Sequence, residues 1–230
     1  FIPFSLLLLN SFFGKVNCMS KSGVFITFEG GEGCGKTSQI NMLAKFLSGR
    51  GCDYTITREP GGTAISEKIR DLLLNAKEGE NMSPKTEMLL FAAARAQHVD
   101  ELIRPALKSG KFVISDRFID STYAYQGVAR SLGFGLAKTV NDIAIAECMP
   151  DLTVLLDLDV VAGLNRAGKR DSGNSDRMGS QKIEFYEKVR LEYLRLAKEN
   201  SERFLVIDAS KSIEEIAGEI SKCVKERFNV

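Results

Sequence analysis

Short apolar runs and longer amphipathic runs alternate along most of this chain. The short runs predict strands, which we place at residues 24–29, 53–58, 112–115, 152–158 and 204–208. The longer runs predict helices, which we place after residue 37 and at 63–74, 85–107, 121–129, 136–148, 160–167, 183–197 and 213–228. Strands separated by helices predict one α/β domain with a parallel sheet and helices on both of its faces.

Four features of this pattern carry further expectations. The run at 152–158 (LTVLLDL) is almost entirely apolar, which is typical of a central strand buried on both faces. Thr63 is expected to cap the helix that follows it. Pro105 should bend or break the long helix at 85–107. Residues 168–179 are rich in charged and small side chains and lack an apolar period, which indicates a flexible segment.

Residues 30–37 (GGEGCGKT) match the pattern G-x-x-x-x-G-K-[ST] of a phosphate-binding loop, between a predicted strand and a predicted helix. Glycines lack a Cβ atom, so successive backbone N–H groups can point at phosphate oxygens near the positive end of the helix dipole. We expect Lys36 to bring positive charge to the β- and γ-phosphates and Thr37 to offer its hydroxyl to Mg²⁺. A chance match on a glycine-rich turn is the alternative. The nucleotide-binding candidates are Gly30, Gly31, Glu32, Gly33, Cys34, Gly35, Lys36 and Thr37.

Composition narrows the class of protein. The 230 residues are 44% hydrophobic, which suits a folded globular domain. The formal net charge is +1, which gives no sign of a surface built for nucleic acid or for a membrane. The five cysteines are scattered without a C-x-x-C pair, so we expect neither a metal framework nor a disulfide framework. A reducing, cytoplasmic compartment is therefore expected.

The first 18 residues form a separate apolar segment. The run at 1–13 (FIPFSLLLLNSFF) is shorter than the roughly 20 residues of a membrane span. No basic residue precedes it, as one would in a secretory signal. We expect Met19 to be the true start, with residues 1–18 arising from upstream translation and residues 19–230 forming one domain. A real N-terminal extension or a degenerate targeting segment is the alternative.

Arginines gather where a transferred phosphoryl group would need positive charge. Arg58, Arg95 and Arg117 lie at predicted strand ends or on the long helix, and the planar fork of arginine can hold two phosphate oxygens at once. A single arginine is more often a solvated surface charge, but several at strand ends favour a site. A second basic group lies in or beside the flexible segment, where it suits a lid over a triphosphate at about 166–180. Its members are Arg166, Lys169, Arg170 and Arg177.

Several motifs together carry a family resemblance. They are FEGGEGCGKT at 28–37, REPGGT at 58–63, LLFAAARAQ at 89–97, DRF at 116–118, STYAYQG at 121–127 and PDLTVLLD at 150–157. In this order they resemble the bacterial thymidylate kinase family over essentially residues 24–228. The resemblance implies a three-layer α/β fold of the P-loop NTP hydrolase type, with a five-stranded parallel sheet and a mobile lid on a nucleoside monophosphate kinase domain. It also implies transfer of the γ-phosphoryl group of ATP to dTMP with Mg²⁺, in dTTP synthesis, by a cytoplasmic homodimer.

The resemblance further implies roles for residues near the phosphate loop. Arg58 and Arg117 should grip the phosphate of the acceptor. Glu32 should lie near the 3′-hydroxyl of the acceptor sugar. Asp116, directly or through water, should serve the metal together with Thr37.

The acceptor nucleoside is implied to contact residues of the two helical motifs. Phe91 should stack on the thymine ring, which suits a flat apolar base. Arg95 should donate to a base carbonyl, and Thr122 should face the base edge that carries N3. Tyr125 should lie against the deoxyribose where a 2′-hydroxyl would project, and Gln126 is a further candidate for the acceptor site.

The same residues have simpler interpretations. Phe91 could belong to the hydrophobic core, and Tyr125 could be a packing aromatic. Asp116 could cap a helix. His98, the single histidine, is interpreted as structural or solvent-facing rather than catalytic.

The resemblance is to the bacterial form of the family, in which lid arginines supply catalytic charge, because Lys36 is the only basic residue of the loop. Arg170 is the first candidate, followed by Arg166 and Arg177. Gly179 departs from the family pattern, which usually has a glutamate after the Asp-Arg-Met run. That departure puts in doubt an acidic contact from the lid to the metal or the sugar.

The sequence leaves two alternative functions. One is the same chemistry with another nucleoside monophosphate or a deoxynucleoside as acceptor. The other is a nucleotide-binding module that has lost catalysis, which the complete phosphate loop disfavours.

Overall fold

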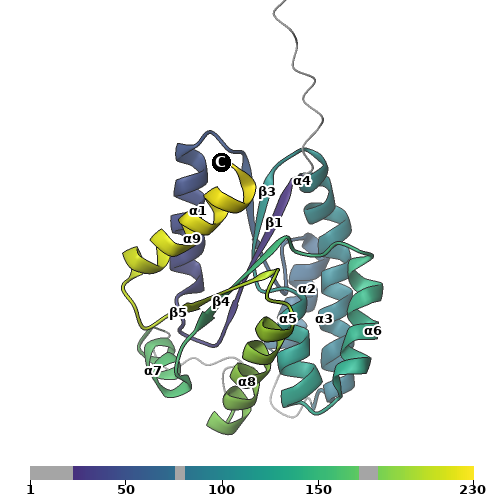
Figure 1. Ribbon diagram of the computed structural model, residues 1–230. Coiled ribbons are helices and arrows are strands. Elements are labelled where there is room, and N and C mark those ends of the chain that lie inside the picture. Colours follow the sequence, from purple (N-terminus) through teal and green to yellow (C-terminus); the bar gives the residue numbers. More distant parts are fainter. Residues whose placement is uncertain (1–22, 76–80, 171–180) are drawn as a thin grey trace, which may run out of the picture.

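The computed structural model describes residues 23–75, 81–170 and 181–230. Its centre is a five-stranded sheet in the order β2-β3-β1-β4-β5, in which every neighbouring pair is parallel (Figure 1). The strands are β1 (Val24–Gly30), β2 (Tyr54–Arg58), β3 (Phe112–Asp116), β4 (Leu152–Asp157) and β5 (Phe204–Asp208). The expected parallel sheet is confirmed, and β4 lies inside it between β1 and β5, as its apolar sequence predicts.

Helices cover both faces of this sheet (Figure 1). They are α1 (Lys36–Gly49), α2 (Ala64–Leu74), α3 (Pro84–His98), α4 (Arg104–Lys108), α5 (Ile119–Thr122), α6 (Phe134–Ile145), α7 (Val160–Arg170), α8 (Ile183–Glu199) and α9 (Ile213–Phe228), with two π-helical segments, η1 (Val99–Ile103) and η2 (Tyr123–Ala129). α1 and α9 pack on one face, and α3, α6 and α8 on the other. The expected three-layer arrangement is therefore present.

Alternation along β1 separates the two hydrophobic cores. Ile26 and Phe28 belong to the core under α1 and α9. Phe25 belongs to the opposite core, under α3, α6 and α8. Because side chains alternate across a strand, Thr27 and Glu29 point to the same side as Phe25. A buried carboxyl group therefore faces α5 and α8.

The long helix expected at 85–107 is divided into three pieces. α3 passes into the π-helical η1 and then into α4, which begins at Arg104. Pro105 lies in the first turn of α4, where its missing N–H group costs no hydrogen bond. The expected break near Pro105 is confirmed, and it takes the form of a wider helical turn just before the proline.

Two other helices differ from expectation. The segment expected as a helix at 121–129 is mostly the π-helical η2, after a short α5. The helix expected at 136–148 lies earlier in the chain, since α6 begins at Phe134 and ends at Ile145, where Ala146 and Glu147 have positive φ angles of 42° and 68°. Thr63 caps α2 as expected, with its Oγ1 accepting from the N–H of Ser66 at 3.3 Å.

The register of the sheet brings three functional segments to one edge. Phe28 and Arg58 both pair with Asp116, and Gly30 pairs with Leu156. The phosphate-loop motif, the Asp-Arg-Phe motif and the start of the Arg-Glu-Pro motif thus meet at the carboxyl ends of the strands, where parallel α/β sheets bind ligands. Within the described ranges, no helix is both long enough and apolar enough to cross a membrane.

Some expectations fall on other parts of the chain. The segment 1–18 and Met19 lie outside the described residues, as do Arg177 and Gly179. The four described cysteines, Cys34, Cys52, Cys148 and Cys223, are all free.

Candidate active site

The phosphate-loop motif forms a tight connection between β1 and α1. β1 ends at Gly30 and α1 begins at Lys36. Gly33 has a φ of +66°, and a Cβ atom there would overlap the carbonyl oxygen of Gly163 on α7. Glycine is therefore required at this position both by the backbone angle and by the close approach of a helix.

The structure describes the placement of two polar side chains of this loop, Lys36 and Thr37. The buried Lys36 donates from Nζ to the carbonyl oxygens of Gly31 at 3.1 Å and Gly30 at 3.4 Å. Its ammonium group thus lies over the loop itself. Thr37 is exposed in the first turn of α1. Cys34, by contrast, is buried in the core.

Arg117 bridges the loop from the neighbouring strand end. Its Nη2 donates to Glu32 Oε1 at 2.8 Å, and its Nη1 donates to the carbonyl oxygen of Gly30 at 3.1 Å. The guanidinium also lies 5.2 Å from the centre of the Tyr125 ring. The structure therefore brings together three residues that the sequence placed in the acceptor site.

Tyr125 packs against two aromatic rings and also carries a buried hydroxyl group. Its ring contacts Phe185 and Tyr193 edge-to-face. Its hydroxyl is buried, however, and has no hydrogen-bond partner within the described ranges. Burial also raises the pKa of the Tyr125 hydroxyl, so the group is neutral and can donate. A buried hydroxyl without a partner is unusual, which makes Tyr125 a candidate for contact with a ligand.

Asp116 ends β3 beside Arg117 and is half-buried. The interpretation of Asp116 as a helix cap is wrong, since α5 begins at Ile119 with Phe118 at its N-cap and no side chain capping it. The carboxylate of Asp116 and the hydroxyl of Thr37 are hard oxygen ligands of the type that Mg²⁺ prefers. No cluster of three or more metal-ligating His, Cys, Asp or Glu side chains occurs in the described part of the chain. These residues fit a Mg²⁺ ion held by few protein ligands and by substrate phosphates.

Arg95 lies inside the protein rather than on its surface, with 2% of its area exposed. Its Nε donates to Glu59 at 2.8 Å, its Nη1 to Thr122 at 2.7 Å and to Asn141 at 2.6 Å, and its Nη2 to the carbonyl oxygen of Phe118 at 3.1 Å. Four of its five N–H groups are used in this way. Arg95 and Thr122, both expected at the acceptor base, are in direct contact.

His98 continues the same network. Its Nδ1 lies 3.1 Å from Glu59 Oε1 and its Nε2 lies 2.7 Å from Thr57 Oγ1. The ring is fully buried, so the solvent-facing alternative is wrong. A Cβ atom on Gly62, whose φ is +88°, would come within 2.6 Å of both His98 and Thr57. The glycine pair of the Arg-Glu-Pro-Gly-Gly-Thr motif thus lets the loop close over this histidine.

The remaining acceptor-site candidates are placed less centrally. Arg58 is half-exposed and forms a two-pronged ion pair with Glu67, at 2.9 and 3.0 Å. Phe91 is half-buried on α3 and belongs to neither core cluster of the described residues, which disfavours the core interpretation. Gln126 is buried, and its Nε2 donates to Glu87 at 2.8 Å.

Among the three lid arginines, Arg166 is the one whose side chain lies in the described part of the structure. It is exposed on α7, and its Nη1 donates to the carbonyl oxygen of Ala209, after β5, at 3.2 Å. Arg170 ends α7, but its side chain lies outside the described part of the structure, as does all of Arg177.

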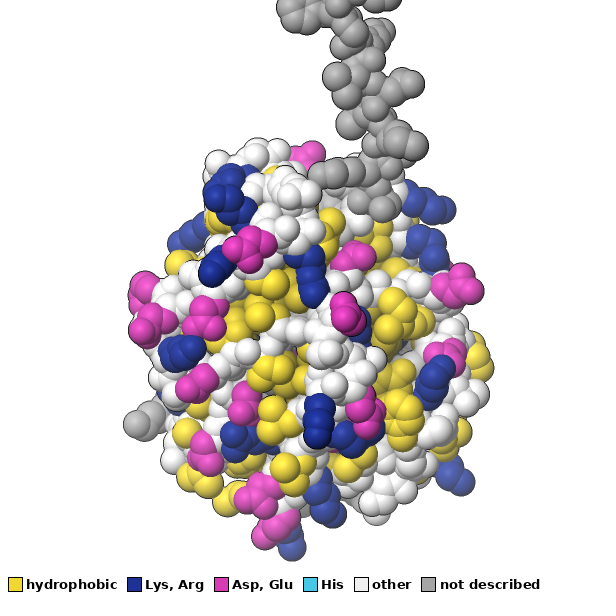
Figure 2. All heavy atoms as spheres, in the orientation of Figure 1, with side chains coloured by type: hydrophobic (Ala, Val, Ile, Leu, Met, Phe, Trp, Pro, Cys, Tyr) yellow, Lys and Arg dark blue, Asp and Glu magenta, His cyan; other side chains and the backbone are white. Residues whose placement is uncertain are grey.

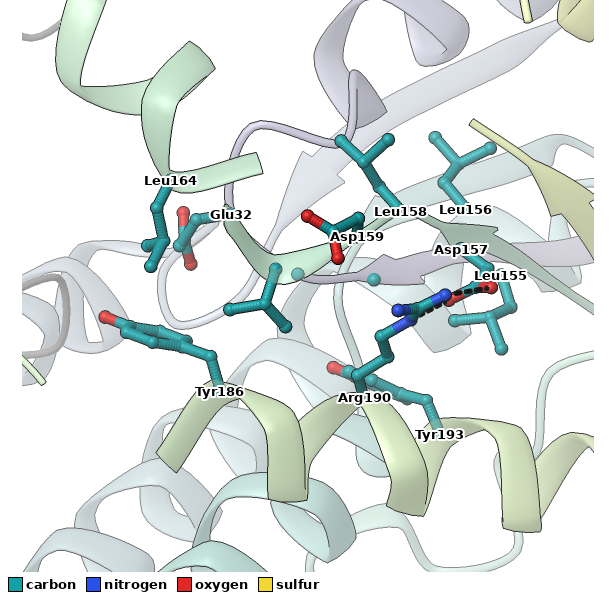
Figure 3. Close-up of a pocket in the computed structure, with 13 residues that line it drawn as sticks. Glu32, Leu155, Leu156, Asp157, Leu158, Asp159, Leu164, Tyr186, Arg190 and Tyr193 are labelled. Carbon is teal, nitrogen blue, oxygen red and sulfur yellow. Dashed lines mark hydrogen bonds and ion pairs between the residues drawn. The ribbon is translucent and has the colours of Figure 1, made fainter. Parts of the chain in front are cut away.

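A hollow lies beside the phosphate loop, between the end of β4 and helices α7 and α8 (Figure 3). Glu32 and Leu164 stand at one side of it, and Arg190 forms a two-pronged pair with Asp157, at 2.7 and 3.0 Å. Tyr193 lines its floor. The hollow thus adjoins the loop carboxylate that pairs with Arg117.

The residues that hold the candidates in place were not predicted from the sequence. Glu59 and Asn141 hold Arg95, while Glu29 and Tyr193 lie behind Arg117. Glu59 could have been found, because it lies inside the Arg-Glu-Pro-Gly-Gly-Thr motif at 58–63 that was singled out in the sequence. The partners from other elements had no local signal.

The family model described as thymidylate kinase matches residues 28–220. A thymidylate kinase from Halothermothrix orenii is 52% identical over 204 residues, which cover 88% of this chain and 97% of that relative. One from Pelobacter propionicus is 47% identical over 212 residues, covering 90% of this chain and 96% of the relative.

A solved structure agrees. The crystal structure of thymidylate kinase from Ehrlichia chaffeensis superposes with a TM-score of 0.72 at 35% identity, covering 88% of this chain and 99% of that chain. The family match extends over most of the chain and includes every motif quoted above. By sequence and by fold, this chain belongs to the thymidylate kinase family.

Proposed function

We propose that this protein transfers the γ-phosphoryl group of ATP to dTMP, giving dTDP for dTTP synthesis. The observation that carries the proposal is the Glu32–Arg117 pair, which lies across the phosphate loop and against Tyr125. An arginine between a phosphate loop and a second pocket can hold an acceptor phosphate in line with the γ-phosphate. In-line positioning and charge stabilisation are what phosphoryl transfer needs from a protein.

On the donor side, Lys36 and the loop N–H groups would bind the triphosphate. Lys36 donates to two loop carbonyls, and charged phosphate oxygens are stronger acceptors than carbonyls. We therefore expect the ammonium to turn toward the β- and γ-phosphates. Mg²⁺, held by Thr37 and Asp116, would neutralise charge on the transferred group.

On the acceptor side, we assign the grip on the dTMP phosphate first to Arg117. Arg58 is engaged by both carboxylate oxygens of Glu67, so it would have to leave that pair to join. Phe91, half-buried on α3, would stack on the thymine ring. The buried Tyr125 would exclude a 2′-hydroxyl, and Glu32 would lie near the 3′-hydroxyl.

The thymine edge would be read by the buried polar groups. Arg95 and Thr122 are in contact, and Arg95 has one further N–H group that could donate to a base carbonyl. Gln126 is a secondary candidate because its amide is engaged by Glu87. A rigid polar wall of this kind discriminates strongly between bases, because a wrong base leaves buried groups unpaired.

The charge on the transferred phosphoryl group would be completed from the lid at about 166–180. Arg170 is our first candidate, and Arg166 and Arg177 follow. The position of Arg166 on α7, whose Gly163 touches the phosphate loop, supports a lid anchored near the triphosphate.

We further propose a homodimer in the cytoplasm. Leu89 on α3 and Ile143 on α6 are 57% and 78% exposed, and these two helices pack side by side. Large exposed apolar side chains on adjoining helices support an interface. Light scattering in solution tests it, and the mass of a single chain would contradict it.

On the face shown in Figure 2, basic and acidic side chains are interspersed, which supports a small-molecule substrate rather than a nucleic acid.

The proposal is tested by measuring ADP formation from ATP and Mg²⁺ with dTMP, dUMP, dCMP and UMP offered separately. We expect a strong preference for dTMP. Preference for another acceptor would keep the phosphate-loop assignment but overturn those of Phe91, Thr122 and Tyr125. ATP binding without turnover of any acceptor would indicate a binding module.

A further inference from the structure

Glu29 is a fully buried carboxyl group one residue before the phosphate loop. It points to the side of the sheet that carries α5 and α8. Burial, together with the nearby charge of Asp120, raises the pKa of Glu29 to about 7. A carboxyl group that the fold keeps in such an unfavourable place is a candidate for a functional role.

The contacts of Glu29 join three separate elements. Its Oε1 accepts from the N–H of Phe118 at 2.8 Å. Its Oε2 accepts from the hydroxyl of Ser121 at 2.7 Å and from the hydroxyl of Tyr193 at 2.8 Å. One carboxylate therefore fixes the loop after β3, the first turn of α5 and the middle of α8.

The same two hydroxyl groups also touch Arg117. Its Nη1 lies 3.4 Å from Ser121 Oγ and 3.3 Å from Tyr193 Oη. Arg117 itself has a φ of 72°, which a side-chain-bearing residue adopts only when its surroundings hold it there. Its neighbour Phe118 is the residue whose N–H group Glu29 binds.

The chemistry of a carboxylate explains why this arrangement orients the arginine. In its ionised form, which prevails above the raised pKa of about 7, the carboxylate of Glu29 can only accept hydrogen bonds, so both hydroxyls turn their protons toward it. Their lone pairs then face the guanidinium of Arg117, which can only donate. An amide in place of the carboxylate would offer N–H donors, and the hydroxyl protons would turn toward the cation.

We propose that Glu29 is a positioning residue that orients Arg117 through the hydroxyls of Ser121 and Tyr193. The inference rests on the proposed function, in which Arg117 grips the acceptor phosphate. It adds a residue that touches neither substrate and predicts an effect on one substrate only. The acceptor side should be affected, because Arg117 lies there, and the ATP side should not.

The test compares Glu29→Gln with wild type, with Arg117→Lys and with the double variant. We expect Glu29→Gln to raise KM for dTMP about tenfold, the scale of one charge-assisted hydrogen bond, with KM for ATP nearly unchanged. The double variant should be no worse than Arg117→Lys alone, because the effect passes through Arg117. The proposal would be overturned if the two substitutions multiplied their effects on KM for dTMP in the double variant. An unchanged KM for dTMP in Glu29→Gln would overturn it as well.

The control is Asp120→Asn, which also alters a fully buried carboxylate. Asp120 pairs with Arg203, at 2.7 and 2.8 Å, and its charge helps to raise the pKa of Glu29, so its loss should leave Glu29 more fully ionised and still able to orient Arg117. It should lower thermal stability without a selective effect on dTMP, and an equal rise in KM for dTMP would count against Glu29. If Glu29→Gln does not fold, Tyr193→Phe removes one of the two relaying hydroxyls and should give the same selective rise. Wild-type turnover of dTMP is measured first, and its absence would remove the proposed function and this inference together.

Discussion

The donor side and the acceptor side of the candidate active site are built by different means. The donor side is backbone: a loop of a few consecutive residues, closed by glycines and a single lysine. The acceptor side is a buried network of charged side chains, in which Arg95 is 2% exposed and Glu59 is 6% exposed. The partners of Arg95 come from three different parts of the chain.

This difference predicts that substitutions on the two sides affect activity and stability in different ways. A loop that binds through N–H groups can lose its one lysine and still fold. A buried ion pair cannot lose one member without leaving the other charge unpaired in a dry environment. We therefore expect donor-side changes to cost activity alone and acceptor-side changes to cost activity and stability together.

The largest expected effect is on stability and comes from Arg95→Ala. It should lower the free energy of unfolding by about 3–5 kcal/mol, because Glu59 is left buried without its partner. Chemical denaturation followed by circular dichroism measures this. Lys138→Ala is the control, since that lysine pairs with Asp142 at an exposed site and should leave the denaturation midpoint nearly unchanged. A loss equal to that of the control would show that the network does not hold the acceptor side.

Lys36→Ala should have the next largest effect, on turnover. Removing a preorganised positive charge from the transferring phosphate costs about 3 kcal/mol or more, at least a hundredfold in kcat. The unfolding midpoint should stay close to wild type, in contrast to Arg95→Ala. The matched control is Lys45→Ala, an exposed lysine on the same helix. Normal turnover in Lys36→Ala would contradict the proposal that Lys36 stabilises the transferring phosphate.

The free energy of unfolding should depend on pH through the buried carboxyl group of Glu29. Its pKa in the folded state is raised from the usual 4.5 to about 7, so the folded protein binds this proton more tightly than the unfolded chain. Its contribution is therefore fully present below about pH 4.5 and is lost as the pH rises through about 7, by up to about 3 kcal/mol. Comparing wild type with Glu29→Gln between pH 5 and pH 8 isolates this contribution. A difference in unfolding free energy between the two proteins that does not change with pH would contradict the raised pKa.

The smallest expected effect concerns the contact of α7 with the phosphate loop. A Cβ atom on Gly163 would overlap the carbonyl oxygen of Glu32, whereas Gly168 on the same helix faces open space. We expect Gly163→Ala to raise KM for ATP severalfold, at a cost of about 1 kcal/mol. Gly168→Ala should be neutral or slightly stabilising, because alanine favours a helix. Equal behaviour of the two variants would show that the contact does not shape the loop.

Much of the fold follows from local signals in the sequence. The five strands, their parallel arrangement and the interior place of β4 follow from short apolar runs between helices. The phosphate loop could also be predicted, because it is formed by consecutive residues whose own backbone sets the geometry. The cap at Thr63 is another local feature, and it was predicted correctly.

The parts that could not be predicted depend on distant partners. Glu59 and Arg95 are 36 positions apart, and Glu29 and Tyr193 are 164 apart. No periodicity or spacing links such pairs before the fold is known. The π-helical turns of η1 and η2 were missed for a related reason, because a wider turn has the same apolar composition as an ordinary helix.

The central claim, that this protein moves a phosphoryl group from ATP to dTMP, is tested most directly by following the group itself. ATP labelled in its γ-phosphate is incubated with the protein, Mg²⁺ and dTMP, and the products are separated by chromatography. The account predicts that the label appears in dTDP and that its appearance depends on dTMP. Label found only in inorganic phosphate, at a rate that dTMP does not change, would contradict it.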